Sequence, residues 1–259
     1  ERLTGRKIEK LYVVGGGTKN TLLNHFTANA LQIPLVIGPT EATAAGNILV
    51  QAIALGLPIS LEERLRGIRW EHYYWANSPE LKTDFARFGV EDAPDFWVNY
   101  GRRQLVALGI ASAQAAELAP TLNRYMKDLY KPASVLEESA LDMLETLKQA
   151  GFKLGVVSNR EKPFHTEIEH LKITPYFDLL LAAGEVRSYK PDPAIFEAAL
   201  QRVGVGPQAA IYVGDNYFAD VVGAQRAGLR PVLYDPRGVY PQADCDVIQD
   251  FGQLPDLLK

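Results

Sequence analysis

Two aspartates, Asp215 and Asp220, follow a short apolar run at residues 210–213 and the turn residue Gly214. The run contains β-branched residues and predicts a buried strand, and Gly214 lets the backbone turn where that strand ends. Ligands of open parallel α/β sheets bind beyond such strand ends. Because Mg²⁺ takes one or two carboxylates together with waters and substrate phosphate, the pair predicts a magnesium site.

Ser158, Asn159 and Lys190 supply the complementary chemistry for a phosphate group. Ser158 and Asn159 follow another apolar run, at residues 152–157, and Lys190 precedes a Pro-Asp-Pro turn. A hydroxyl or an N–H group hydrogen-bonds a phosphoryl oxygen, and an ammonium group neutralises its charge. We therefore expect these three residues to bind phosphate beside the carboxylates.

Each of these side chains also has a simpler structural interpretation. Asp215 could cap a helix, Asp220 could be a solvated acid of a first helical turn, and Ser158 could cap a strand end. Lys190 alone is an ordinary exposed lysine before proline. The joint order of the segments, at strand ends that share one sheet edge, favours the binding site.

The elements that would position these residues alternate between strand and helix from residue 134 to residue 240. Strands are predicted at 152–157, 177–181, 210–213 and 231–234, and helices at 134–150, 165–171, 194–202 and 219–227. This alternation predicts an α/β fold, a Rossmann-like parallel sheet with helices on both faces. Residues 231–234 are expected to be its last strand.

The stretch from 69 to 129 has aromatic and leucine side chains at helical intervals and predicts a small helical subdomain. Its aromatic stripe and His72 are expected to be structural. Upstream, the sequence predicts two strands, at 8–14 and 34–37, and two helices, at 21–31 and 42–55. A turn at Gly15, Gly16 and Gly17 follows the first strand. The glycines could cradle the phosphates of an ATP-like cofactor, or only allow tight packing between strand and helix.

The totals of the chain exclude several classes of protein. Its 259 residues are 47% hydrophobic and 22% charged, with a formal net charge of −4, which offers no basic surface for nucleic acid. No apolar stretch reaches the roughly 18 residues that span a bilayer, and no signal peptide is recognised at the start. With Cys245 as the lone cysteine, we expect a cytoplasmic protein.

The Ser158-Asn-Arg segment, the Lys190-Pro-Asp-Pro segment and the Gly214-Asp-Asn-Tyr-Phe-Ala-Asp220 segment resemble motifs II to IV of the haloacid dehalogenase superfamily. The resemblance spans residues 70–259 and implies a Rossmann-like core at 133–259 and a helical C1 cap at 67–132. It implies a Mg²⁺-dependent phosphatase acting on a small phosphorylated metabolite, with Ser158 and Lys190 as catalytic residues and Asp215 and Asp220 on the metal.

The segment at residues 1–66 resembles a different family over about residues 8–66. The Val-Val-Gly-Gly-Gly-Thr-Lys-Asn segment that ends at Asn20, with the Gly-Pro-Thr-Glu segment at 38–41, is similar to the C-terminal end of FGGY-type sugar kinases, nearest to rhamnulokinase. In that family the glycine turn lies beside the adenosine moiety of ATP. The sugar-binding half of such a kinase has no counterpart here, so the chain is expected to be a chimera.

The dehalogenase superfamily carries its nucleophile in an Asp-x-Asp-x-Thr motif before the cap, and this chain lacks it. No aspartate occurs in residues 1–83, and Asp244 with Asp246 is the only Asp-x-Asp pair. An aspartyl-phosphate route needs one carboxylate in line with phosphorus and a second as general acid and base. The resemblance therefore implies a phosphohydrolase that is inactive or impaired.

Two alternatives remain open. The chain could be a noncatalytic scaffold in which residues 1–66 lend a surrogate strand to the sheet, or residues 1–66 could retain ATP binding. An unpaired sheet edge left by the absent first strand would also allow a homo-oligomer.

Overall fold

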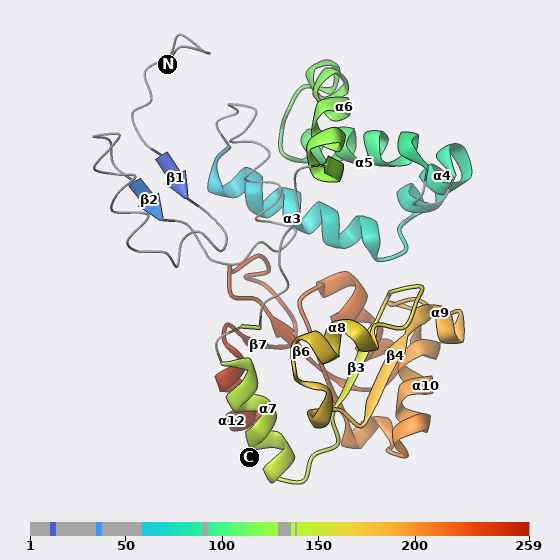
Figure 1. Ribbon diagram of the computed structural model, residues 1–259, viewed down its shortest axis with the longest axis vertical. Helices are drawn as coiled ribbons and strands as arrows, with labels where there is room; N and C mark the ends of the chain where they lie inside the picture. The colour runs from blue at the N-terminus through green and yellow to red at the C-terminus, as the bar shows by residue number, and fades with distance from the viewer. Residues whose placement is uncertain are drawn as a thin grey trace. The chain divides into compact units, whose positions relative to one another are not determined.

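The computed structural model describes residues 11–13, 35–37, 59–89, 93–128, 136–137 and 139–258. Contacts within the chain divide it into two compact units (Figure 1), residues 1–68 with 97–133 as unit 1 and residues 69–96 with 134–259 as unit 2. The predicted division at residues 66 and 132 stays a prediction.

The described residues of unit 1 contain a pair of short strands, parts of two helices and the whole of a third. Strands β1 (Leu11–Val13) and β2 (Leu35–Ile37) pair in parallel, as expected from the predicted strands at 8–14 and 34–37. The predicted helices at 21–31 and 42–55 and the glycine turn at Gly15, Gly16 and Gly17 lie outside the described residues. Among the described strands, β1 pairs only with β2, so no surrogate strand at Leu11–Val13 joins the sheet of unit 2.

The helices of the predicted cap are α3 (Leu61–Trp75), α4 (Pro79–Phe88), α5 (Pro94–Ala107) and α6 (Ser112–Asp128). In unit 1, Leu105, Ala115 and Leu122 form a small buried cluster. In unit 2, α4 begins where the Ser78 hydroxyl accepts a hydrogen bond from the Leu81 N–H at 3.1 Å, with Pro79 as its first residue. Tyr74 and Phe96 are fully buried, which confirms the structural interpretation of this part of the aromatic stripe.

The rest of unit 2 is an α/β fold, as the sequence predicts. Its strands are β3 (Gly155–Ser158), β4 (Leu179–Ala182), β5 (Ile211–Gly214), β6 (Arg230–Tyr234) and β7 (Asp246–Ile248). Its helices are α7 (Ala140–Gln149), α8 (His165–His170), α9 (Ala183–Val186), α10 (Pro193–Val203), α11 (Val222–Arg226) and α12 (Leu254–Leu257). All strand pairs are parallel, in the orders β3–β4 and β5–β6–β7.

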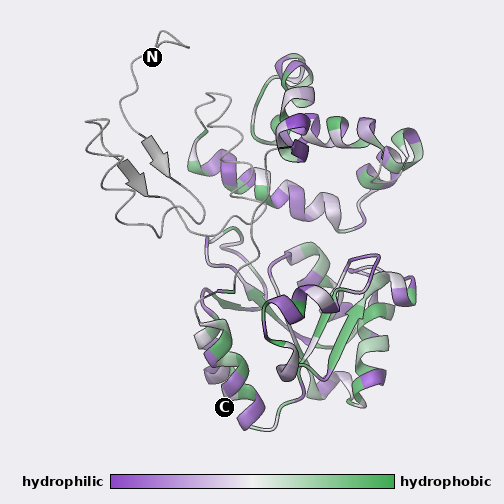
Figure 2. Cartoon of the chain, viewed as in Figure 1, coloured by the Kyte–Doolittle hydropathy of each residue, from purple (hydrophilic) through white to green (hydrophobic). Residues whose placement is uncertain are grey.

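Alternate side chains along these strands enter two buried clusters. Val156, Leu180 and Ile211 pack into one cluster with α7, α8 and α12, whereas Val157 and Tyr212 pack into the other with α10 and α11. This period of two is what a sheet covered by helices on both faces requires. The helices can be followed in Figure 1, and β3 and β4 are coloured hydrophobic in Figure 2.

The sheet of unit 2 is interrupted between β3 and β5. The two parallel ladders share both clusters, yet among the described strands no ladder joins β3 to β5. Neither strand has a single buried residue, although β4 and β6 hold Leu181, Ala182, Val232 and Leu233 at 1% exposure or less. The continuous sheet expected from the alternation is thus two pieces of one layer.

The structure corrects three predicted elements. The helix predicted at 134–150 begins only at Ala140, because the Glu137 carboxylate accepts hydrogen bonds from the N–H and hydroxyl of Ser139 and holds a local turn there. The helix predicted at 219–227 starts as a π-helical turn, Tyr217–Val221, before α11. Residues 231–234 are not the last strand, because the three-residue β7 pairs with β6.

Candidate active site

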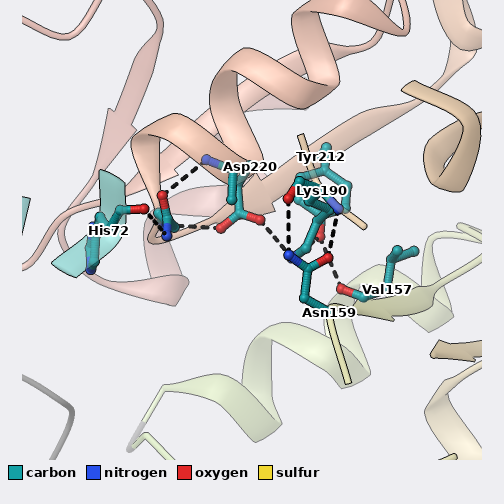
Figure 3. Close-up of polar contacts among 8 residues, drawn as sticks. His72, Val157, Asn159, Lys190, Tyr212 and Asp220 are labelled. Carbon is teal, nitrogen blue, oxygen red and sulfur yellow. Dashed lines mark hydrogen bonds and ion pairs between the residues drawn. The ribbon is translucent and has the colours of Figure 1, made fainter. Parts of the chain in front are cut away.

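Lys190 and Asp220 form a buried ion pair at the ends of the strands (Figure 3). The Lys190 Nζ lies 2.7 Å from the Asp220 Oδ1, and the two side chains are 12% and 5% exposed. Lys190 stands just before the Pro-Asp-Pro turn that starts α10, and Asp220 lies in the π-helical turn after β5. Burial alone would lower the pKa of Lys190, but the Asp220 carboxylate and Tyr212 outweigh it and raise that pKa, so Lys190 stays charged.

Tyr212 links this ion pair to the neighbouring strand. The Lys190 Nζ donates to the Tyr212 hydroxyl at 3.0 Å, and that hydroxyl donates to the Val157 carbonyl of β3 at 3.0 Å. Burial raises the pKa of Tyr212 to about 12, although the Lys190 ammonium group acts in the opposite direction and lowers this pKa. A side chain of β5 therefore satisfies a carbonyl of β3 where no ladder joins the two strands.

Asn159 holds the backbone of Lys190 from the end of β3. Its Nδ2 donates to the Lys190 carbonyl at 3.0 Å, and its Oδ1 accepts from the Lys190 N–H at 2.6 Å. Both polar groups of this amide are used on one residue, so Asn159 positions the lysine. Its predicted role as a direct phosphate ligand stays a prediction.

The turn after β5 is built around Asp220 and Asn216. The Asp220 Oδ2 accepts from the Asn216 N–H at 2.9 Å, and the Asn216 Oδ1 caps the turn by accepting from the Ala219 N–H at 3.0 Å. A Cβ atom at Gly214 would overlap the Asp220 carboxyl group, so glycine is required there for close approach rather than for flexibility. The Asn216 Nδ2 also donates to the His72 carbonyl at 3.0 Å.

Asp215 and Ser158 also lie at strand ends, but their side chains are not part of the hydrogen-bond network around Lys190 and Asp220. Asp215 is exposed, and its carboxylate makes no hydrogen bond or ion pair with a described residue. Its charge nevertheless acts on the same site, since it helps to raise the pKa of Tyr212. Ser158 is half-buried at the last position of β3, and its hydroxyl has no partner among the described residues.

His72 lies beside the turn as a structural residue. Its Nδ1 is 3.0 Å from the Tyr240 hydroxyl and its ring stacks on Tyr240 at 5.9 Å. Burial lowers the pKa of His72, while the carboxylates of Asp215, Asp220 and Asp235 raise it. These contacts agree with the structural role expected from the sequence.

The donor set fits a magnesium ion that is held mainly by water and substrate. No group of three or more His, Cys, Asp or Glu side chains suited to a metal occurs in the part of the chain that the structure describes. Asp215 is free to coordinate, whereas both oxygens of Asp220 already accept hydrogen bonds. Because Mg²⁺ binds through one or two carboxylates and keeps several waters, the pair is sufficient, with Asp215 as the more available ligand.

The sole Asp-x-Asp pair of the chain cannot supply a nucleophile here. Asp246 is bound by Arg230, the first residue of β6, with the two groups 2.6 Å apart, and Asp244 accepts from the Tyr217 hydroxyl at 2.8 Å. Arg230 stands at the amino-terminal end of its strand, whereas Asp215 follows a carboxyl-terminal end. Asp246 pairs in register with Val232, the middle residue of β6, so that β6 separates it from β5 and Asp215.

Sequence reasoning missed Tyr212 and Asn216. Tyr212 was only one member of an apolar run, and its position between two strands depends on which ladders form. Asn216 had a detectable signal, because an asparagine three residues before a helical N–H is a common cap.

Comparisons with known proteins match the two parts of the chain to two families. Residues 92–233, more than half of the chain, match the model of haloacid dehalogenase-like hydrolases. Residues 1–55 match the C-terminal domain of the FGGY family of carbohydrate kinases.

Individual relatives follow the same division. A rhamnulokinase of Bacteroides thetaiotaomicron is 59% identical over 54 residues, which are 21% of this chain and 11% of the kinase. Haloacid dehalogenase-like hydrolase domain-containing protein 3 of Mus musculus is 35% identical over 151 residues, 58% of this chain and 59% of that protein. A glyceraldehyde 3-phosphate phosphatase of Methanothermobacter thermautotrophicus is 28% identical over 235 residues, 83% of this chain and 89% of that enzyme. The chain thus spans less than two thirds of the length of the first two relatives.

A solved structure shares the fold. The HAD-hydrolase YfnB of Bacillus subtilis, described as bound to magnesium, superposes with a TM-score of 0.50 at 18% identity over 83% of this chain and 91% of that one. No helix among the described residues is long and apolar enough to cross a membrane. With its parallel sheet, its motif residues at the strand ends and a family model over more than half its length, the chain belongs to the haloacid dehalogenase-like hydrolases.

Proposed function

We propose that unit 2 binds the phosphate group of a small phosphorylated metabolite together with Mg²⁺, and that hydrolysis is strongly impaired in this chain. The observation that carries the proposal is the buried Lys190–Asp220 pair beside the exposed Asp215, whose carboxylate has no partner among the described residues. A cation held in place next to a free carboxylate suits a phosphate group and its counter-ion.

Each residue has a defined task in this proposal. Lys190, fixed by Asn159 and Tyr212, neutralises phosphate charge, and the Ser158 hydroxyl donates a hydrogen bond to a phosphoryl oxygen. Asp215 holds the magnesium, with Asp220 orienting Lys190. Magnesium, when bound, stabilises charge on phosphoryl oxygens.

The impairment follows from the carboxylates that are present. Asp215 and Asp220, in the loop after β5, are both assigned to the cation site. Asp235, which directly follows β6, is buried, and its two oxygens accept hydrogen bonds from the Val239 and Tyr240 N–H groups.

In the Asp-x-Asp pair, Asp246 is engaged by Arg230 and Asp244 by the Tyr217 hydroxyl, so among the described carboxylates named here none is left to attack phosphorus. The phosphatase relative makes phosphate monoesters the substrate class to test.

The test separates binding from turnover. Titration with inorganic phosphate and Mg²⁺, followed by calorimetry, should show binding that Asp215→Asn and Ser158→Ala both weaken. Hydrolysis of p-nitrophenyl phosphate by the same samples should stay near the uncatalysed rate. Absence of phosphate binding would contradict the site, and magnesium-dependent turnover that Asp215→Asn abolishes would contradict the impairment.

A further inference from the structure

A cavity within unit 2 adjoins the segments that carry Lys190 and Asp220, although neither of these two residues lines it. It has a volume of about 520 Å³, within the range of small-molecule sites. Its walls come from the end of α3, the start of α4, the start of α10, the π-helical turn and α11. None of the predicted site residues lines it, so it is separate from the phosphate site.

Two cations line this cavity without a counter-ion among the residues that the structure describes. Lys82, in α4, and Arg226, the last residue of α11, are both exposed, and neither side chain makes an ion pair or hydrogen bond with any residue in the described ranges. The acid in the same lining, Asp192, caps α10 by accepting from the Ala194 N–H at 2.9 Å. The lining therefore keeps two unneutralised positive charges against one engaged carboxylate.

Helix geometry adds to this positive potential. The helices α4 and α10 both begin at the cavity wall, at Pro79 and Pro193. The amino-terminal end of a helix carries partial positive charge. These ends reinforce the two side-chain cations, which remain the main basis for anion binding.

Most of the remaining wall is apolar and partly aromatic, with Asn77 and Ser78 as its polar members. The rings of Tyr73 and Phe218 meet edge to face with their centroids 5.6 Å apart, and Pro191 and Val222 line the cavity as well. Flat apolar rings pack well against such a surface, and an aromatic ligand can also stack on the guanidinium group of Arg226.

We propose that this cavity binds a small organic anion with a flat, aromatic body, with Lys82 and Arg226 holding its acidic group and Tyr73 and Phe218 its ring. The walls also include Phe218, two residues before Asp220, and Pro191, the residue after Lys190. A ligand bound there contacts the two segments that carry the ion pair, and so it can adjust the phosphate site without entering it.

The test uses the full chain and 1-naphthoate, a carboxylate without phosphate, so it does not depend on the proposed function. We expect saturable one-to-one binding, and affinity reduced at least about tenfold in the double variant Lys82→Gln with Arg226→Gln, since hydrogen bonds to charged groups are worth about 1.5–3 kcal/mol. Tyr73→Leu should weaken binding less. Arg124→Gln, which removes an exposed arginine of α6, is the matched control and should bind like the wild type.

Two further ligands establish the chemistry of the site. Acetate has the charge without the ring, and 1-naphthylmethylamine has the ring with the opposite charge, so both should bind much more weakly than 1-naphthoate. Thermal unfolding of each variant confirms that it is folded. The proposal is overturned if 1-naphthoate does not saturate, if the double variant binds it as well as the wild type, or if the amine binds equally well.

Discussion

In unit 2, the loops at the strand ends and the strands beneath them differ in how many of their polar groups are hydrogen-bonded to one another. In the loops, Asn159, Lys190, Tyr212 and Asp220 satisfy one another through hydrogen bonds between 2.6 and 3.0 Å long. Directly below, β3 and β5 share no ladder and have no fully buried residue. The polar groups of the site are thus more fully hydrogen-bonded to one another than β3 and β5 are paired.

This difference shows which interactions fix the site. In a continuous sheet, ladder hydrogen bonds would set the distance between β3 and β5. Here the chain from Val157 through Tyr212 and Lys190 to Asp220 crosses from one ladder to the other. Side chains, rather than backbone pairing, therefore hold the two halves of the site in register.

Removing Asp220 should produce the largest effect on this network. Asp220→Ala leaves the ammonium group of Lys190 buried without its counter-charge, and we expect a loss of about 3–5 kcal/mol in the free energy of unfolding. Urea unfolding measures it. Asp215→Ala removes an exposed carboxylate and should change stability by less than about 0.5 kcal/mol.

A double variant identifies the cause of that loss. Asp220→Ala with Lys190→Met removes both charges, so no orphan ammonium remains and the destabilisation should be smaller than in Asp220→Ala alone. If the double variant were as unstable as the single variant, packing rather than charge would account for the effect.

Gly214→Ala tests the close approach between Gly214 and Asp220 in the same turn. The added methyl group would overlap the Asp220 carboxyl group, and relief requires the turn to move. We expect a loss of roughly 1–3 kcal/mol and weaker Mg²⁺ binding. Gly206→Ala, at a glycine with open space around its Cβ position, is the control and should be close to neutral.

The fold of unit 2 was largely predictable from sequence because its strands are apolar and its helices have clear ends. Pro193 begins α10 and Gly204, with φ of 73°, ends it, close to the predicted bounds of 194–202. The three-residue β7 was missed because only one of its residues, Ile248, is fully buried, so the pattern carries almost no strand signal.

The sequence predicted that the side chains of the candidate site lie at strand ends, but it did not predict which of them bond to each other. The sequence places Asp215 and Asp220 as equivalent carboxylates, whereas the structure leaves Asp215 exposed and pairs Asp220 with Lys190. Which acid meets the lysine depends on the π-helical turn, and that turn depends on the Asn216 cap. Contacts between segments far apart in the chain cannot be derived from either segment alone.

Asn159→Ala should reduce the stability of the protein by an intermediate amount, because it weakens the hydrogen bonds between the loops at the strand ends. It removes both hydrogen bonds to the Lys190 backbone, and we expect a loss of about 1–3 kcal/mol in stability, together with weaker phosphate binding. Calorimetric titration with phosphate measures the second effect. Asn159→Asp keeps the acceptor for the Lys190 N–H but not the donor, so it should retain part of the stability, whereas equal losses in both variants would contradict the two-point contact.

Tyr212→Phe should give the smallest loss in the free energy of unfolding. This variant tests the hydrogen-bonded bridge between β3 and β5 most directly. It removes the donor to the Val157 carbonyl and the acceptor for the Lys190 Nζ while leaving the ring, so we expect a loss of about 1 kcal/mol below pH 10. The pKa of Tyr212 is raised from 10.0 to about 12 in the folded state, so its contribution is complete below pH 10 and is lost as the pH rises toward 12. Urea unfolding of both proteins across this range should therefore show their stabilities converging. A difference that stays constant up to pH 12 would contradict the raised pKa of Tyr212, whereas no difference below pH 10 would contradict the bridge between the two ladders.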